Sequence, residues 1–174
     1  MGVVRFTLWA IFRLLISLRY RVRVHGLEQV RNFKEGTLIL PNHVALMDPP
    51  LVFTSLWRAL KPRPLVFEGN FQNLLFYPLM KLVRAVPLPD MERPRAKARA
   101  RTELAIAEVI EGLRKGENHL LWPSGDLSRD GQERLGGAKA VGEILRAVPE
   151  ANIVLVRTRG LWGSMTSFAP TGPV

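Results

Sequence analysis

The sequence predicts an α/β fold in which helices flank a mainly parallel sheet, preceded by an amphipathic helix suited to a membrane interface. First, short apolar runs of strand-like composition alternate with longer segments of helical spacing. Second, the chain has 174 residues, 47% of them hydrophobic, which suffices for one domain with its own core. Third, the first 20 residues are strongly apolar, and their only charged residues are arginines.

The N-terminal segment is expected to form a helix with one polar stripe. In helical projection Arg5, Arg13 and Arg19 fall within about a third of the circumference, and apolar residues fill the rest. Arg13 divides the apolar run, which is therefore shorter than the roughly 18 to 20 uncharged residues that cross a bilayer. We expect residues 1–20 to lie in a membrane interface. A core helix of a soluble domain is the alternative.

The remaining elements follow from hydrophobic periodicity. Strands are expected at residues 21–24, 37–40, 64–67, 85–88, 119–122 and 153–157, and helices at 51–60, 70–83, 95–114 and 137–148. Because strands alternate with helices, parallel pairing is expected. No further helical segment follows residue 157, so we expect the second part of the chain, residues 21–174, to be C-terminally incomplete.

Composition limits the partners. The chain has no cysteine, which excludes disulfides, thiolate zinc sites and thiol nucleophiles. The formal net charge of +10 predicts an acidic partner, which is nucleic acid, an anionic bilayer or an acidic carrier protein. We expect no nucleic acid, because nucleic-acid-binding proteins usually place cations beside exposed aromatic residues. Five cations stand at every second position, namely Arg93, Arg95, Lys97, Arg99 and Arg101. They form either the solvated start of a helix or a docking patch for phosphate groups or an acyl carrier protein.

His43 and Asp48 are the candidate catalytic pair. The segment from Pro41 to Pro50 follows the apolar run 37–40, and α/β sheets place their sites at the carboxyl ends of strands. A straight helix would separate the two side chains, so they meet only if the chain turns between them. Asp48, which precedes Pro49, is expected to cap a helix that begins at the proline. Such a pair supports base catalysis, although a loop histidine and a cap alone would fit the spacing equally well.

A second cluster, Trp122-Pro123-Ser124-Gly125 followed by Ser128 and Arg129, also stands at a strand end. Backbone amides of the turn at Gly125, with Ser128 and Arg129, are candidates to hold a phosphate or a developing oxyanion. Ser124 lacks the G-x-S-x-G surroundings of a nucleophile, which argues against a serine hydrolase.

Together the two clusters resemble the motifs of glycerolipid acyltransferases of the 1-acylglycerol-3-phosphate acyltransferase type. His43-x4-Asp48, preceded by Asn42, is similar to their first motif, and Trp122-Pro123-Ser124-Gly125 is similar to a later Phe-Pro-Glu-Gly motif. Ser124 stands where the family usually has Glu. Residues 123–129 and 159–164 look most like the acyltransferase portion of certain bifunctional proteins. Those proteins also carry an acyl-activating ligase and reacylate lysophospholipids such as 2-acylglycerophosphoethanolamine.

The resemblance implies an O-acyltransferase of phospholipid synthesis or remodelling, with residues 21–174 as its domain. His43 and Asp48 would be catalytic, and the substrate-binding residues would be Asn42, Ser124, Gly125, Ser128 and Arg129. The acyl donor would be a thioester of coenzyme A or of acyl carrier protein, and the acceptor the hydroxyl of a lysophospholipid or 1-acylglycerol-3-phosphate.

No cofactor and no metal are expected. The implied location is peripheral, at the anionic surface of the cytoplasmic face of the bacterial inner membrane. A non-catalytic module on the same fold, which binds a membrane surface or a carrier protein, is the alternative function.

Overall fold

The computed structural model of the chain describes residues 2–74, 76–89, 96–134 and 138–169. Its central element is a five-stranded sheet with the strand order β3-β2-β4-β1-β5, in which every pairing is parallel. The parallel pairing of the sheet is therefore as predicted. In chain order the elements are α1 (Gly2–Arg19), α2 (Leu27–Val30), β1 (Thr37–Pro41), α3 (Asp48–Leu60), β2 (Arg63–Phe67), η1 (Glu68–Phe71), α4 (Tyr77–Leu82), β3 (Val86–Leu88), α5 (Ala96–Arg114), β4 (His119–Leu120), α6 (Ala138–Ala147) and β5 (Asn152–Val156).

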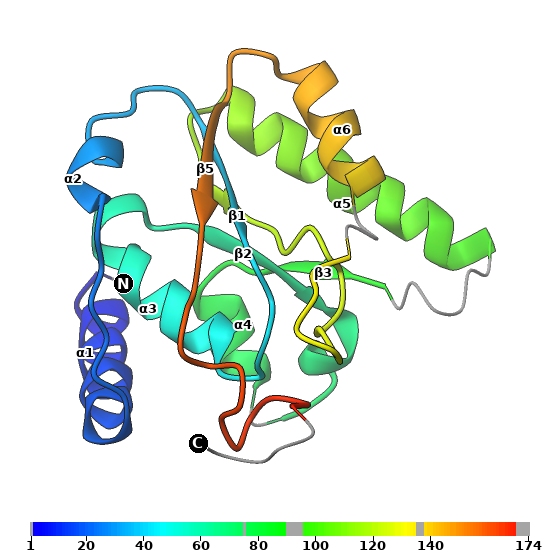
Figure 1. Ribbon diagram of the computed structural model, residues 1–174. Coiled ribbons are helices and arrows are strands. Elements are labelled where there is room, and N and C mark those ends of the chain that lie inside the picture. The colour runs from blue at the N-terminus through cyan, green and yellow to red at the C-terminus, as the bar shows by residue number, and fades with distance from the viewer. Residues whose placement is uncertain (1, 75, 90–95, 135–137, 170–174) are drawn as a thin grey trace.

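Helices cover both faces of the sheet (Figure 1). On one face, Leu38 and Leu40 of β1 pack against buried residues of α5 and α6. On the other face, Ile39 packs against Val52 and Leu56 of α3. Alternate residues of β1 thus serve two cores, which explains why this strand is a continuous apolar run.

Helix α1 packs beside α3 on the second of these faces (Figure 1). The Trp9 indole donates a hydrogen bond to the Thr54 carbonyl at 2.7 Å, and Arg13 donates to the Ser55 hydroxyl at 3.2 Å. Ile16 is buried in a third core cluster. Arg13, predicted on the polar stripe, thus faces the domain, while Leu14 and Leu18 are 63% and 77% exposed. The helix contributes to the fold and leaves apolar side chains in solvent.

Two predicted elements are wrong. Residues 21–24 form no strand, because Val22 packs beside Ile16 in the third cluster and the segment has no neighbouring strand to pair with. The single helix expected at 70–83 is replaced by the short η1 and α4, and α4 begins at Tyr77 next to Pro78. Proline is tolerated in the first turn of a helix but not in its interior, so a continuous helix cannot form there.

The series of alternating cations is only partly described, since Arg93 and Arg95 lie outside the described residues. In α5, Lys97 is exposed, Arg99 pairs with Glu103 at 3.2 Å, and Arg101 pairs with Glu68 at 2.6 Å. Because two of these three cations already have acidic partners, the arrangement favours a solvated helix start over a docking patch.

His119 is fully buried at the start of β4. Neither of its ring nitrogens has a hydrogen-bond partner among the described residues. Nε2 lies 3.9 Å from Glu117 Oε2, and Glu117 is also paired with Arg63 and Arg84. Burial lowers the pKa of His119 to about 4, and the charge of Arg63 acts in the same direction. His119 is therefore neutral in the folded protein at neutral pH.

We expect His119 to lower the free energy of unfolding by about 3 kcal/mol as the pH falls from 6.5 to about 4. Within this window the unfolded chain binds a proton at His119 that the folded protein does not bind, so acid favours unfolding. Urea unfolding across the window, compared with the His119→Leu variant, measures the effect. The variant should lose less stability on acidification, and parallel curves for the two proteins would contradict the assignment.

Candidate active site

The turn between β1 and α3 brings His43 to Asp48. Nδ1 of His43 lies 3.4 Å from Oδ2 of Asp48, the carboxylate is fully buried, and the imidazole side chain is 15% exposed. The turn stands at the carboxyl end of β1, an inner strand of the sheet. The structure therefore places one partly accessible imidazole against one inaccessible carboxylate.

The backbone of the turn fixes the Asp48 carboxylate. Oδ2 accepts hydrogen bonds from the amides of Val44 at 2.6 Å and Ala45 at 2.8 Å. Asp48 was predicted to cap a helix starting at Pro49, but α3 already begins at Asp48 and the carboxylate bonds back to the preceding turn. Because two amides hold this oxygen, the carboxylate stays in place whether or not the imidazole is protonated.

Thr158, which follows β5, provides a third contact to the carboxylate. Its hydroxyl lies 2.9 Å from Asp48 Oδ1 and 2.9 Å from Asn42 Oδ1. The Thr158 amide donates to Asn42 Oδ1 at 2.7 Å, and Asn42 Nδ2 donates to the Thr158 carbonyl at 3.2 Å. Asn42, predicted to bind substrate, thus pairs with Thr158 through both groups of its amide, which indicates a role in joining the ends of β1 and β5.

Two further side chains surround the imidazole. The ring of His43 lies 5.6 Å from that of Trp122, measured between centroids. Partial burial raises the pKa of the Glu133 carboxyl, an effect that the charge of His43 opposes and the charge of Asp48 reinforces. The charges of His43 and Asp48 therefore act on Glu133 in opposite directions. The described residues offer no hydrogen-bond partner to Nε2 of His43, so this nitrogen is available to a substrate.

The loop after β4 is attached to the turn through Ser128, whose amide donates to the His43 carbonyl at 3.0 Å. The Ser128 hydroxyl donates to the Gln132 carbonyl at 2.8 Å, so both donors of Ser128 are used within the protein. A pocket of about 270 Å³ lies in this loop, and its lining includes Ser124, Ser128, Arg129, Glu133 and Arg134. Of the residues predicted to bind substrate, Ser124, Ser128 and Arg129 thus lie together.

The donors of this loop differ from those expected. Gly125 has φ of 72° and its amide is bonded to the Trp122 carbonyl, so this amide is not free for an oxyanion. Among the described residues, the amides of Ser124 and Asp126 have no acceptor, and the Ser124 hydroxyl is buried without a partner. Arg129 is exposed and lies 5.7 Å from the Phe168 ring. These groups remain available for an anionic ligand.

The segment after β5 completes the site, and sequence analysis assigned no role to it. Beyond Thr158, the Leu161 side chain packs on Ala45, and the Thr166 carbonyl accepts a hydrogen bond from the Leu46 amide at 2.8 Å. In Figure 1 the chain continues below the sheet after β1 and after β5, and the Ser128 amide joins the loop after β4 to the first of these segments. Residues 157–164 directly follow a predicted strand, and the carboxyl ends of parallel strands meet at one edge of a sheet. This position was the sequence feature that could have assigned the segment to the site.

Such an arrangement can abstract a proton. With Nδ1–H directed at Asp48, the neutral imidazole presents Nε2 as a base, and the carboxylate stabilises the imidazolium that forms. The pair is therefore suited to activate a hydroxyl group of a substrate as a base.

Comparison with known proteins agrees with this geometry. Residues 21–157 match the family described as Acyltransferase. The crystal structure of the 1-acyl-sn-glycerophosphate acyltransferase PlsC from Thermotoga maritima has a similar fold, with a TM-score of 0.72 and 18% identity. That alignment covers 94% of this chain, which spans 61% of the length of PlsC. No curated protein sequence matches. Since the family match includes both motifs and the whole sheet, this chain belongs to the acyltransferase family.

Proposed function

We propose that this protein transfers a fatty acyl group from an acyl thioester to the hydroxyl of a lysophospholipid at a membrane surface. The observation that carries this proposal is the His43–Asp48 pair, with 3.4 Å between Nδ1 and Oδ2, at the carboxyl end of β1 in a chain of the acyltransferase family. Asp48 is buried and held by three donors, whereas His43 is partly accessible. The pair is therefore preorganised for base catalysis.

In the proposed reaction, Nε2 of His43 takes the proton of the acceptor hydroxyl as the oxygen attacks the thioester carbonyl. The tetrahedral intermediate collapses when the carbon–sulfur bond breaks, and the imidazolium returns its proton to the thiolate that leaves. The product is an ester, and no group of the protein is consumed. Asp48 keeps the proton of the neutral imidazole on Nδ1 and stabilises the cationic form. The amides of Ser124 and Asp126 are the candidate donors for the oxyanion.

The pocket in the loop after β4, which the Ser128 amide joins to the His43 carbonyl, is the proposed site of the acceptor head group. It presents the Arg129 guanidinium and the unpartnered Ser124 hydroxyl, which suit a phosphate. Glu133 lines the same pocket and can meet a head group that carries a positive charge. We propose a lysophospholipid acceptor on these grounds, with 2-acylglycerophosphoethanolamine and 1-acylglycerol-3-phosphate as the leading candidates.

The proposal is tested by incubating the protein with lysophospholipids of different head groups and with acyl thioesters of coenzyme A and of acyl carrier protein. Lipid mass spectrometry then identifies the diacyl product, and thiol release measures its rate. Transfer to one of the lysophospholipids, dependent on His43, is expected. Absence of transfer with every donor and acceptor, from folded protein supplied with vesicles, would contradict the proposal.

A membrane surface, at the cytoplasmic face of a bacterial inner membrane, is the proposed location. No helix among the described residues has the length and apolar character needed to cross a bilayer. Helix α1 instead leaves large apolar side chains in solvent while it packs on α3, namely Val3, Val4, Phe6, Ile11, Phe12, Leu14, Leu15 and Leu18. We propose that residues 1–20 insert these side chains into the bilayer interface beside the domain.

Leu18→Gln is expected to weaken binding to vesicles about tenfold, because the leucine would lose its burial among lipid chains. Leu18 is 77% exposed, so the substitution should not alter folding. Leu104→Gln on α5 is the matched control, since Leu104 is 70% exposed and lies on a helix across the sheet from α3. Vesicle sedimentation measures both variants, and equal binding by both would contradict the proposed role of α1.

A further inference from the structure

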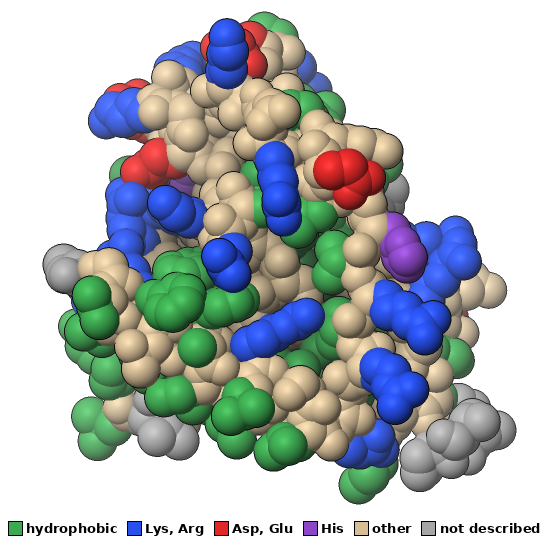
Figure 2. Space-filling model, turned by 90° about the vertical axis from the view of Figure 1, so that its left-hand side faces the viewer, with side chains coloured by type: hydrophobic (Ala, Val, Ile, Leu, Met, Phe, Trp, Pro, Cys, Tyr) green, Lys and Arg blue, Asp and Glu red, His purple; other side chains and the backbone are tan. Residues whose placement is uncertain are grey.

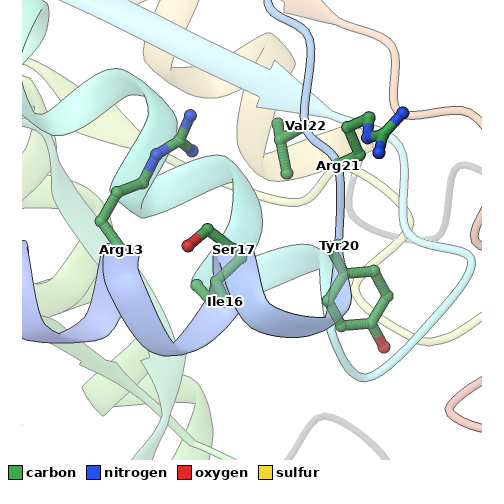
Figure 3. A pocket seen from close by; sticks show the side chains of 6 residues that line it. All are labelled: Arg13, Ile16, Ser17, Tyr20, Arg21 and Val22. Carbon is green, nitrogen blue, oxygen red and sulfur yellow. The ribbon is translucent and has the colours of Figure 1, made fainter.

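A cavity of about 240 Å³ lies between the second half of α1 and the segment that follows it. Arg13, Ile16 and Ser17 of α1 line it, together with Tyr20, Arg21 and Val22 (Figure 3). Neither sequence motif contributes to this cavity, and it shares no lining residue with the pocket beside His43. It is therefore a second site on the molecule.

The cavity contains positive charge without acidic neighbours. Its lining has two guanidinium groups, from Arg13 and Arg21, and no carboxylate. Among the described residues neither arginine has an acidic partner within ion-pair distance, in contrast to Arg63, Arg84, Arg99, Arg101 and Arg134. Two uncompensated guanidinium groups beside the Ser17 hydroxyl favour an anion, and guanidinium groups suit the oxygen atoms of a phosphate.

The position of Arg13 is determined by the fold. Its guanidinium donates to the Ser55 hydroxyl on α3 at 3.2 Å, which holds the side chain in the gap between the helices. Arg21 is exposed and lies just beyond the end of α1, across the cavity from Arg13 (Figure 3). One cation is thus held by a hydrogen bond, and the other is exposed to solvent at the opposite edge of the cavity.

The surroundings distinguish a lipid from a free anion. Leu14 stands three residues before Ser17 and is therefore its neighbour on the helix surface, where it is 63% exposed. Leu18 follows Leu14 one turn later and is 77% exposed, so the apolar side of α1 begins at the edge of the cavity. Figure 2 shows this side of the molecule, where hydrophobic side chains gather in the lower half and Lys and Arg side chains lie among and above them. A cationic cavity beside an exposed apolar helix face complements a molecule that joins a phosphate to acyl chains.

We propose that this cavity binds the phosphodiester of an anionic membrane phospholipid whose acyl chains lie along α1. The inference rests on the membrane location proposed above, to which it adds a specific head-group site separate from the acceptor pocket. Ile16, which lines the cavity, also packs in one cluster with Ala45 of the catalytic turn. A lipid bound here would therefore fix the orientation of the His43–Asp48 site relative to the bilayer.

The test compares two double variants that lose the same charge. Arg13→Gln/Arg21→Gln alters the cavity, whereas Arg23→Gln/Arg31→Gln removes two other exposed cations that do not line it. Vesicles of equal parts phosphatidylglycerol and phosphatidylcholine report binding. Diffuse attraction to an anionic surface weakens about fivefold for each charge removed. We expect the cavity variant to bind at least tenfold more weakly than the control variant.

A second measurement uses dihexanoylphosphatidylglycerol below its micelle concentration, which has no membrane surface. Isothermal titration should show saturable one-to-one binding that is lost in Arg13→Gln/Arg21→Gln and retained in the control. Arg21→Gln alone, set against Arg23→Gln, applies the same comparison without disturbing the contact with Ser55. Inorganic phosphate serves as a competitor, and its displacement of the lipid at equal concentration would show a site for the free anion and overturn the lipid assignment.

The outcomes separate this inference from the proposed location. Equal losses by the two double variants, with the parent protein bound to vesicles, would overturn the cavity site and leave the membrane location intact. Failure of the folded parent protein to bind any anionic vesicle would overturn both.

Discussion

Replacing His43 by alanine is expected to lower the rate of acyl transfer by at least about 10³-fold while the protein remains folded. The imidazole is the only base that the described turn presents to a substrate, and its Nδ1 is directed at a buried carboxylate at 3.4 Å. Without it, the acceptor hydroxyl must lose its proton to water. Thiol release under single-turnover conditions measures the chemical step directly.

His25→Ala is the matched control for this experiment. His25 is exposed and precedes α2, and it lies outside both pockets. It should retain the activity of the parent protein, which would show that the loss in His43→Ala does not reflect removal of any histidine. Retention of more than a tenth of the parent rate by His43→Ala would require a different base, and Glu133, whose pKa is raised by partial burial, would then be tested next.

Hydrophobic periodicity predicted the elements whose conformation is determined by their own sequence. The apolar run at residues 37–40 is a buried strand, the run at 64–67 is a partly buried one, and the periodic segment 95–114 is α5 almost to the residue. The alternation at 21–24 failed because a period of two also arises in an extended segment that packs one side on a helix. Whether such a segment pairs with a neighbouring strand depends on the whole sheet, so the sequence of four residues cannot predict it.

The sequence motifs predicted the catalytic pair, but they did not predict the residue from a distant segment that holds it in place. His43 and Asp48 are close in the chain, so only a local turn was needed to bring them together. Thr158 reaches Asp48 from 110 residues away, and it does so because β5 pairs with β1. Strand order is a property of the assembled sheet, so no single segment could identify Thr158. The same reason explains why Asn42, adjacent to the motif histidine, pairs with Thr158.

Helix α1 shows how a correct element can have an unexpected orientation. Periodicity placed Arg13 on a polar stripe, and a polar stripe on an isolated helix would face water. In the structure Arg13 faces α3, because Ser55 and the adjacent cavity accommodate its guanidinium. The apolar residues that remain in solvent are consequently on the side away from the domain, which is the arrangement that the proposed membrane contact requires.

The second large effect is expected at Asp48, where asparagine and alanine should behave differently. In Asp48→Asn the amide oxygen can accept from the Val44 and Ala45 amides as Oδ2 does now. The new NH₂ group can donate to the Thr158 hydroxyl, which then donates to Asn42 Oδ1 at 2.9 Å. Every buried polar group keeps a partner, so the fold should be retained. Only the negative charge is lost.

Loss of that charge should lower turnover by about 10² to 10⁴-fold, because the imidazolium formed in the transition state is no longer stabilised. Asp48→Ala should in addition lower the free energy of unfolding by about 2 to 4 kcal/mol, since it leaves two buried amides without acceptors. Thermal unfolding and single-turnover kinetics separate the two effects.

Thr158→Val provides the structural control for the Asp48→Asn variant. Combined with Asp48→Asn, it removes the acceptor for the new NH₂ group, so the double variant should be about 1 to 3 kcal/mol less stable than Asp48→Asn. Near-parent turnover in Asp48→Asn would mean that the carboxylate organises the turn without acting on the imidazole. The pair would then be a structural feature of the turn, and base catalysis by His43 would lose the contact on which it was proposed.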